Sequence, residues 1–140
     1  MLVRRRNRDR QFQSPAGFDG NGVVASGNQS LISLEGTDHA TISGFTLSDV
    51  GTEASNADIS EAGIVVRGSH DNSISGNHFV NLPQDVHLIE GSHDNLISNN
   101  RLDHLLASGI FANYGASANT ISGNDIQWIG EEFIGNGPFS

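Results

Sequence analysis

Three polar residues in three similar segments have side chains suited to acid–base chemistry on a charged substrate. His78, Arg101 and Asp125 each follow an asparagine and lie 23 and then 24 residues apart. If the segments stack as parallel strands, these side chains stand about 4.8 Å apart on one face. Removing a proton next to a carboxylate requires a cation that neutralises the carboxylate, a base and an acid.

The catalytic hypothesis assigns these roles to residues of two neighbouring columns. Arg101 is then the cation and His78 the base, with His104 in support. Asp125 contributes to substrate binding, and Trp128, in the column of His104, offers a flat surface on which a substrate ring stacks. The alternative, which we favour, is an ion pair between Arg101 and Asp125 on adjacent coils, which stabilises the fold modestly.

A third column, formed by Glu35, Arg67 and Glu90 and followed by Tyr114, alternates in charge. Alternating charges on a strand face favour pairing between neighbouring strands, so we prefer a ladder of ion pairs here. In the alternative, Arg67 contacts a substrate carboxylate and Tyr114 belongs to the same substrate surface.

The tetrapeptide Ser-His-Asp-Asn occurs twice, at residues 69–72 and 92–95. Histidine and aspartate are metal-ligand types. Both copies occupy the same turn of a repeat, where Asp and Asn serve backbone geometry, so we predict no metal site. Calcium held by acidic turns remains an alternative, although no DxDxDG loop is present. We predict no other cofactor.

These residues need elements that repeat with the same period. Four segments align without gaps, beginning at Gly36, Gly68, Gly91 and Gly115, and each follows a short apolar strand. Their spacing of 32, 23 and 24 residues gives a basic period of 23–24, with one enlarged coil. Such a period predicts a solenoid in which the coils bury their apolar faces against each other.

Apolar and asparagine columns define the predicted coil. Isoleucine recurs at positions 42, 74, 97 and 121, and apolar residues recur at 47, 79, 102 and 126. Asparagines recur at 72, 95 and 119 and at 77, 100 and 124, where stacked amides can pass hydrogen bonds from coil to coil. We place Val86 and Leu88 inside and His87 outside, because a buried unpaired imidazole is costly. The sequence therefore predicts an all-β, right-handed parallel β-helix of four to five coils.

Composition bounds the partners and the domains. The 140 residues include no cysteine and no lysine, and five of the seven arginines lie in the first ten positions. From residue 11 onward, two arginines face fifteen acidic residues, so nucleic acid and anionic membranes are excluded as partners. We expect residues 1–21 to be a mobile basic flank and residues 22–140 to form the β-helix domain.

The pattern G-I-V-V…N-x-I-S-G-N, present as Gly63–Val66 and Asn72–Asn77, resembles a known repeat. It is similar to the parallel β-helix repeat of the pectate-lyase-like superfamily, which includes mannuronan epimerases, polysaccharide lyases and NosD-type periplasmic proteins. The resemblance spans roughly residues 22 to 134. It implies carbohydrate, often acidic polysaccharide, as the ligand, and a place outside the cytoplasm, although no signal peptide is visible.

Three functions are consistent with these observations. The first is a carbohydrate-associated β-helix module without catalysis of its own, which we favour because the D-P-H-E and paired-aspartate motifs of β-helix enzymes are absent. The second is a lyase or epimerase acting on a uronate-containing polysaccharide. The third is a structural unit that self-associates through open solenoid ends.

Overall fold

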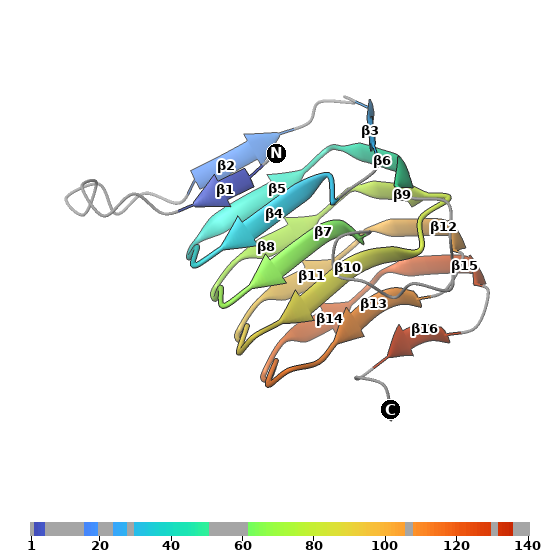
Figure 1. The fold of residues 1–140 in the computed structure, drawn as a ribbon. Helices are drawn as coiled ribbons and strands as arrows, with labels where there is room; N and C mark the ends of the chain where they lie inside the picture. The colour runs from blue at the N-terminus through green and yellow to red at the C-terminus, as the bar shows by residue number, and fades with distance from the viewer. Residues whose placement is uncertain are drawn as a thin grey trace.

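The computed structural model describes residues 2–4, 16–19, 24–27, 30–50, 62–105, 108–129 and 132–135. Within these ranges the chain forms strands and turns and no helix. The strands lie in three parallel sheets, and the chain visits the sheets in turn before it begins the next coil (Figure 1). The protein is an all-β parallel β-helix, as the repeat predicted.

Each sheet takes one strand from each coil, and we name the sheets A, B and C in the order in which the chain visits them. Sheet A contains β1 (Leu2–Arg4), β4 (Ile32–Glu35), β7 (Ala62–Arg67), β10 (Gln84–Ile89), β13 (Ser108–Ala112) and β16 (Glu132–Gly135). Sheet B contains β2 (Ala16–Asp19), β5 (Ala40–Ser43), β8 (Ser73–Ser75), β11 (Leu96–Ser98) and β14 (Thr120–Ser122). Sheet C contains β3 (Val24–Gly27), β6 (Thr46–Val50), β9 (His78–Val80), β12 (Arg101–Leu105) and β15 (Asp125–Ile129).

Apolar side chains from the three sheets fill the interior of the solenoid. Ile42, Ile74 and Ile97 are paired in register in sheet B and fully buried. In sheet C the stacked positions are occupied by Leu47, Phe79 and Leu102, which are also fully buried. Because a single coil is too thin to bury these side chains, the core depends on stacking.

Asparagine ladders hold both ends of the sheet B strands. In the first ladder, Asn72 donates its side-chain amide to Asn95 over 2.9 Å, and Asn95 donates to Asn119 over the same distance. The second ladder passes from Asn77 to Asn100 over 3.1 Å and from there to Asn124. Side-chain bonds between coils were predicted for both columns, and both are confirmed.

The left-handed backbone of the corners lies one residue before these asparagines. Asp71 and Asp94 have φ values of 54° and 53° and precede the first ladder. Gly76 and Asn99, with φ values of 67° and 54°, precede the second. The asparagine side chains therefore serve hydrogen bonding, and the preceding residue makes the turn.

Two further details differ from the gapless alignment. Arg67 pairs with Ile89, not with Glu90, because the turn between β10 and β11 contains one additional residue. Residues 2–4 and 16–19, which we expected in a flank outside the repeat, are strands of sheets A and B. The insertion at residues 51–61 lies outside the described residues.

Candidate functional site

The outer face of sheet C contains the predicted column of polar residues. Arg101 is in register with His78 on one side and with Asp125 on the other. These three side chains alternate along their strands with Phe79 and Leu102, which are fully buried, and with Ile126, which is partly buried. They therefore lie on the outer face. The stacking of this column follows the prediction.

The carboxylate that Arg101 contacts is Asp103, not Asp125. The Nε of Arg101 donates to Oδ2 of Asp103 over 2.6 Å, and Asp103 lies two residues further on the same strand face. Asp125 instead accepts two hydrogen bonds from the amide of Gln127, each 3.0 Å long. The predicted ion pair between coils is therefore corrected to a pair within β12.

Asp103 also holds His78, which belongs to the preceding coil. The Nε2 of His78 lies 3.2 Å from the same Oδ2 atom of Asp103. The side chain of Asp103 is 8% exposed, whereas those of His78 and Arg101 are 38% and 57% exposed. We call these three residues the Asp103 cluster: a buried carboxylate that fixes an accessible imidazole and an accessible guanidinium.

The protonation of Asp103 reflects opposing effects. Burial raises its pKa, but the hydrogen bonds from His78 and Arg101 and their charges outweigh burial, and the pKa lies below its usual value. Asp103 therefore remains a carboxylate at neutral pH. When Nε2–H of neutral His78 donates to it, Nδ1 carries the lone pair of a base.

A second acid, Asp85, is buried near the Asp103 cluster at the start of β10. Its side chain is fully buried, and neither carboxyl oxygen has a hydrogen-bond partner among the residues that the structure describes. Burial, and to a lesser degree the charge of Asp103, raises its pKa well above the usual value. The adjacent Gln84 is 1% exposed, and its amide oxygen and nitrogen also have no hydrogen-bond partner within the described ranges.

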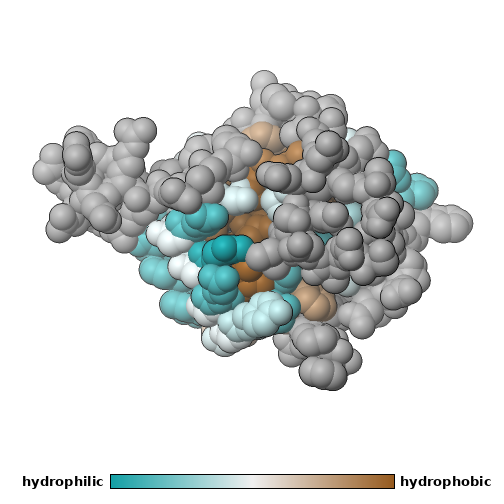
Figure 2. Space-filling model, in the orientation of Figure 1, coloured by the Kyte–Doolittle hydropathy of each residue, from teal (hydrophilic) through white to brown (hydrophobic). Residues whose placement is uncertain are grey.

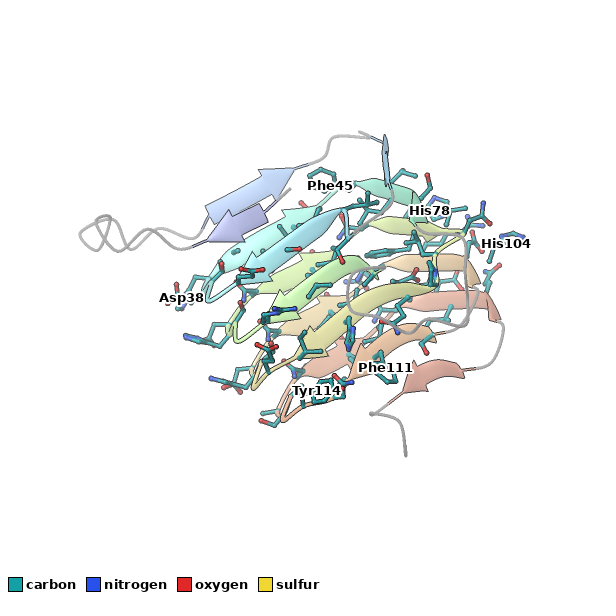
Figure 3. All side chains as sticks on the ribbon, viewed as in Figure 1. Asp38, Phe45, His78, His104, Phe111 and Tyr114 are labelled. Carbon is teal, nitrogen blue, oxygen red and sulfur yellow. The ribbon has the colours of Figure 1, made fainter. Side chains whose placement is uncertain are left out.

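The other predicted residues are spread over the surface. His104 is exposed near the end of β12 with a φ of 55°, and flanking pairs place it opposite Trp128, whose side chain lies outside the described residues. Figure 3 shows His78 and His104 on one side of the solenoid, away from Tyr114. Tyr114 is 71% exposed at the turn that follows β13.

Arg67 lies on sheet A, and its Nε is 3.8 Å from an oxygen of Glu90. The predicted ion pair between Arg67 and Glu90 is therefore present, although Glu90 lies one residue beyond Ile89, the register partner of Arg67. Glu35 is in register with Arg67 on the other side. His87 lies on the outer side of β10, as predicted, since Val86 and Leu88 belong to the core. It is nevertheless buried, with Nε2 3.1 Å from Oδ1 of Asn113 and its ring edge against Phe111.

Histidine–aspartate pairs repeat along the corner between sheets A and B. The rings of His70 and His93 are stacked with centroids 5.0 Å apart and an angle of 8° between their planes. The Nδ1 atoms lie 2.9 and 2.8 Å from the carboxylates of Asp71 and Asp94, respectively. The hydrogen bond from His70 is the main cause of a lowered pKa at Asp71. Figure 2 shows hydrophilic residues along this corner.

The corner between sheets A and B contains histidine and aspartate, which are metal-ligand types, in pairs. Among the residues that the structure describes, no three His, Asp or Glu side chains are arranged to hold one metal ion. The left-handed backbone of Asp71 and Asp94 agrees with the turn role that the sequence indicated.

Sequence reasoning missed Asp103 and Asp85. The spacing Arg101-x-Asp103 on a strand is a usable signal, because residues two apart lie on the same face. No comparable signal marks Asp85, since its burial depends on how β10 enters sheet A.

Comparison with known proteins identifies one family. The family described as periplasmic copper-binding protein (NosD) matches residues 15–132, which is more than half of the chain. No curated protein and no solved structure matches the chain. Within the described ranges, no helix is long and apolar enough to cross a membrane. On the extent of this match, the chain belongs to the NosD family of β-helix proteins.

Proposed function

We propose that this chain is a carbohydrate-binding β-helix module whose Asp103 cluster binds an acidic, uronate-containing polysaccharide. The observation that carries the proposal is the shared Oδ2 atom of Asp103, which holds Arg101 and His78 side by side on adjacent coils. The family description supports a site of action in the periplasm.

The guanidinium of Arg101 has donors to spare. Its Nε is used by Asp103, and the two terminal nitrogens make no hydrogen bond to any residue that the structure describes. The planar fork of an arginine fits a carboxylate through two parallel hydrogen bonds. A uronate carboxylate is therefore a better match for Arg101 than a neutral sugar hydroxyl.

The surrounding charge is unfavourable for a polyanion, because the chain has a formal net charge of −9. Binding must therefore come from contacts within the cluster and not from long-range attraction. We expect calcium to strengthen binding, because a divalent cation offsets the repulsion between acidic protein and acidic sugar. Asp125, next to Arg101, is an exposed carboxylate where such a cation would gather.

The experiment is a binding titration of polygalacturonate and alginate, with and without calcium, against the wild type and two arginine variants. We expect Arg101→Ala to weaken binding at least tenfold. Arg67→Ala is the matched control, because Arg67 lies on sheet A beside Glu90, and we expect binding to be unchanged. Equal affinity of both variants and the wild type would refute the proposal.

The Asp103 cluster also contains the groups that a proton-transfer site requires. His78 is oriented by a carboxylate and stands next to Arg101, which would neutralise the acid group of the sugar. The ultraviolet absorbance of new unsaturated sugar ends measures lyase activity, and proton NMR measures epimerisation. Turnover that His78→Gln abolishes while binding persists would make the module an enzyme, whereas binding without turnover is the result we expect.

A second candidate function is copper binding at the His70–His93 pair. The family description names copper, and each imidazole has its Nδ1 held by an aspartate, which leaves Nε2 for a metal. Copper titration followed by electron paramagnetic resonance tests this function. We expect nitrogen hyperfine structure that His70→Ala removes and His104→Ala retains; an unchanged signal in both variants would exclude this pair.

A further inference from the structure

Two adjacent polar side chains at the start of β10 are buried. Asp85 is fully buried and Gln84 is 1% exposed, and neither the carboxyl nor the amide has a hydrogen-bond partner among the residues that the structure describes. Glycine occupies the position next to Asp85 in both neighbouring coils, at Gly63 and Gly109. The equivalent positions of the repeat therefore offer no charged side chain to Asp85.

The space around Asp85 is filled on the side of the preceding coil. A Cβ atom at Gly63 would lie 2.9 Å from Cδ1 of Leu82 and 3.0 Å from the backbone oxygen of Asp85. Both distances are shorter than an ordinary van der Waals contact, so this side has no room for an additional group. A buried carboxylate without a partner is costly. This cost is avoided if Asp85 keeps its proton, or if the backbone opens and admits water.

One short turn connects Asp85 to the Asp103 cluster. His78 lies at the start of β9, and residues 81–83 lead from β9 into β10. The backbone N–H of Asn81 donates to the backbone oxygen of Asp103 over 3.2 Å. We call residues 81–85 the β9–β10 corner. A displacement of Asp85 therefore acts on a segment that follows His78 and is itself bonded to Asp103.

The groups around the β9–β10 corner favour the protonated form of Asp85. Burial is the main cause of its raised pKa, and the negative charge of Asp103 adds to it. The cationic groups of the cluster, Arg101 and His78, are held by Asp103. No titratable residue occurs in β13. The other titratable residues of β7, β10 and β12 are Arg67, His87 and His104. Burial and a like charge therefore act together on Asp85.

We propose that release of the proton from Asp85 opens the β9–β10 corner and separates His78 from Asp103, so that the Asp103 cluster holds its acidic ligand only while Asp85 is protonated. The inference rests on the proposed function, because it concerns the regulation of the same site. Opening lets water reach the carboxylate, which removes the cost of its burial. By linkage, a ligand that binds only the closed corner favours the protonated form of Asp85, so binding to the opened form takes up a proton. The module therefore releases an acidic polysaccharide as the pH rises.

Amide hydrogen exchange of the full chain, without ligand, tests the opening. The N–H groups of Asn81 and of Ser108, which donates to Pro83 over 3.0 Å, report on the corner. The N–H of Leu96, which donates to Asn72 over 2.8 Å, reports on sheet B. From pH 5 upward we expect protection at the corner, corrected for the exchange of free amides, to fall by about tenfold per pH unit until Asp85 is ionised in both forms. Protection at Leu96 should remain higher at every pH.

Two variants assign this dependence to one carboxyl. Asp85→Asn imitates the protonated form, and we expect its corner protection to be independent of pH. Glu90→Gln is the matched control and should behave like the wild type, because it removes an exposed carboxylate just beyond the other end of β10. The nitrogen chemical shifts of the His78 ring, measured on the same samples, show whether its contact with Asp103 is lost at high pH.

Titration of polygalacturonate at each pH measures the consequence for binding. The ratio between the affinities of Asp85→Asn and the wild type isolates the contribution of Asp85, because His78 titrates in both proteins. We expect this ratio to be close to one at pH 5 and to reach about tenfold or more at pH 9.

Three results would overturn the inference. The first is a wild-type corner that is as well protected as Leu96 at pH 9, which also decides the question if Asp85→Asn does not fold. The second is a pH dependence that persists in folded Asp85→Asn. The third is an opened corner with unchanged His78 shifts or an affinity ratio that stays at one. If no polysaccharide binds at any pH, the proposed function fails, whereas exchange and the His78 shifts still decide whether Asp85 controls the cluster.

Discussion

Sheet B and the corner where sheet C leads into sheet A treat buried polar groups in opposite ways. Around sheet B, Asn95 and its equivalents bond to the coils above and below through both the oxygen and the nitrogen of the amide. At the corner, Asp85 and Gln84 are as deeply buried, but their side chains have no hydrogen-bond partner in the part of the chain that the structure describes. The ladder residues recur in every central coil, and the corner residues occur once.

This difference in hydrogen bonding distinguishes the repeated asparagines, which define the coil, from Asp85 and Gln84, whose burial lowers stability. A repeated asparagine is stabilised by its copies, so each amide has a partner of known position. Asp85 lies between Gly63 and Gly109 in neighbouring coils, and the described pairing of β7, β10 and β13 passes over these three residues. No copy stabilises it. Substitutions of the unrepeated polar residues next to the Asp103 cluster are therefore the most informative tests of function.

The largest expected effect is the loss of a ladder residue. Asn95→Ala removes bonds to Asn72, Ser69 and Asn119 and leaves buried donors and acceptors unpaired. We expect the free energy of unfolding to fall by about 3 kcal/mol. Urea denaturation followed by circular dichroism measures this change.

Asn99→Gly is the matched control for that variant. Asn99 is exposed with a φ of 54°, and glycines occupy the equivalent positions 44, 76 and 123. Because glycine adopts this backbone without strain, we expect a change within about 0.5 kcal/mol. Comparable losses in both variants would show that the ladder contributes no more than an ordinary surface asparagine.

The second largest change in the free energy of unfolding is expected from substitution of Asp85, and this substitution should raise stability. Burial raises the pKa of Asp85 above its ordinary value of 3.8, so the folded state retains a proton that the unfolded state releases. The stability of the wild type therefore falls as pH rises from about 4 until it passes the folded pKa. Asp85→Asn removes this dependence, and we expect it to be more stable than the wild type by roughly 2 kcal/mol at pH 7.

Urea denaturation of wild type and Asp85→Asn at pH 4 and pH 7 measures this difference. The two proteins should be close in stability at pH 4 and should diverge as pH rises. If the wild type is more stable than Asp85→Asn at pH 7, the carboxylate of Asp85 has a stabilising partner in solution. Asp85 would then contribute to stability, as the asparagines of the ladders do.

The repeated part of this contrast is predictable from sequence, and the unrepeated part is not. Ile42, Ile74 and Ile97 specify the interior because the same residue returns with the period of the coil. Asn72 and Asn77 identify the ladders for the same reason. These columns determine the parallel β-helix, its coil length and the outward direction of His78 and Arg101.

Contacts that depend on a single residue could not be derived from the period. Asp103 has Val80 and Gln127 as its neighbours in register, so nothing in the repeat indicates that it captures Arg101 in place of Asp125. The additional residue at Glu90 shifts the end of β10 by one position, and a gapless alignment conceals it. The periodic pattern predicts backbone stacking, but the partner of a long side chain depends on every group within its reach.

A smaller effect is expected at Asp103 itself. Its carboxylate is stabilised by His78 and Arg101, and its pKa is lowered, so its contribution to stability exists above the ordinary pKa and disappears as pH falls below it. We expect Asp103→Asn to be less stable than the wild type at pH 7 and nearly equal to it at pH 3. Exposure of Arg101 to solvent screens the pair and limits the difference. Thermal melting at the two pH values measures it, and a difference that does not change with pH would exclude ionic stabilisation of the cluster.

The smallest effect on stability is expected at Leu96, in the centre of the outer face of sheet B. Leu96 is 39% exposed and extends away from the core, and threonine occupies the equivalent position at Thr41 and Thr120. Threonine also favours strands, so Leu96→Thr should change the free energy of unfolding by no more than about 0.5 kcal/mol. Urea denaturation measures this value, and the matched substitution Ile97→Thr, one residue along and fully buried, should destabilise the protein severely. If Leu96→Thr is also strongly destabilising, the outer face of sheet B contributes to the packing of the fold.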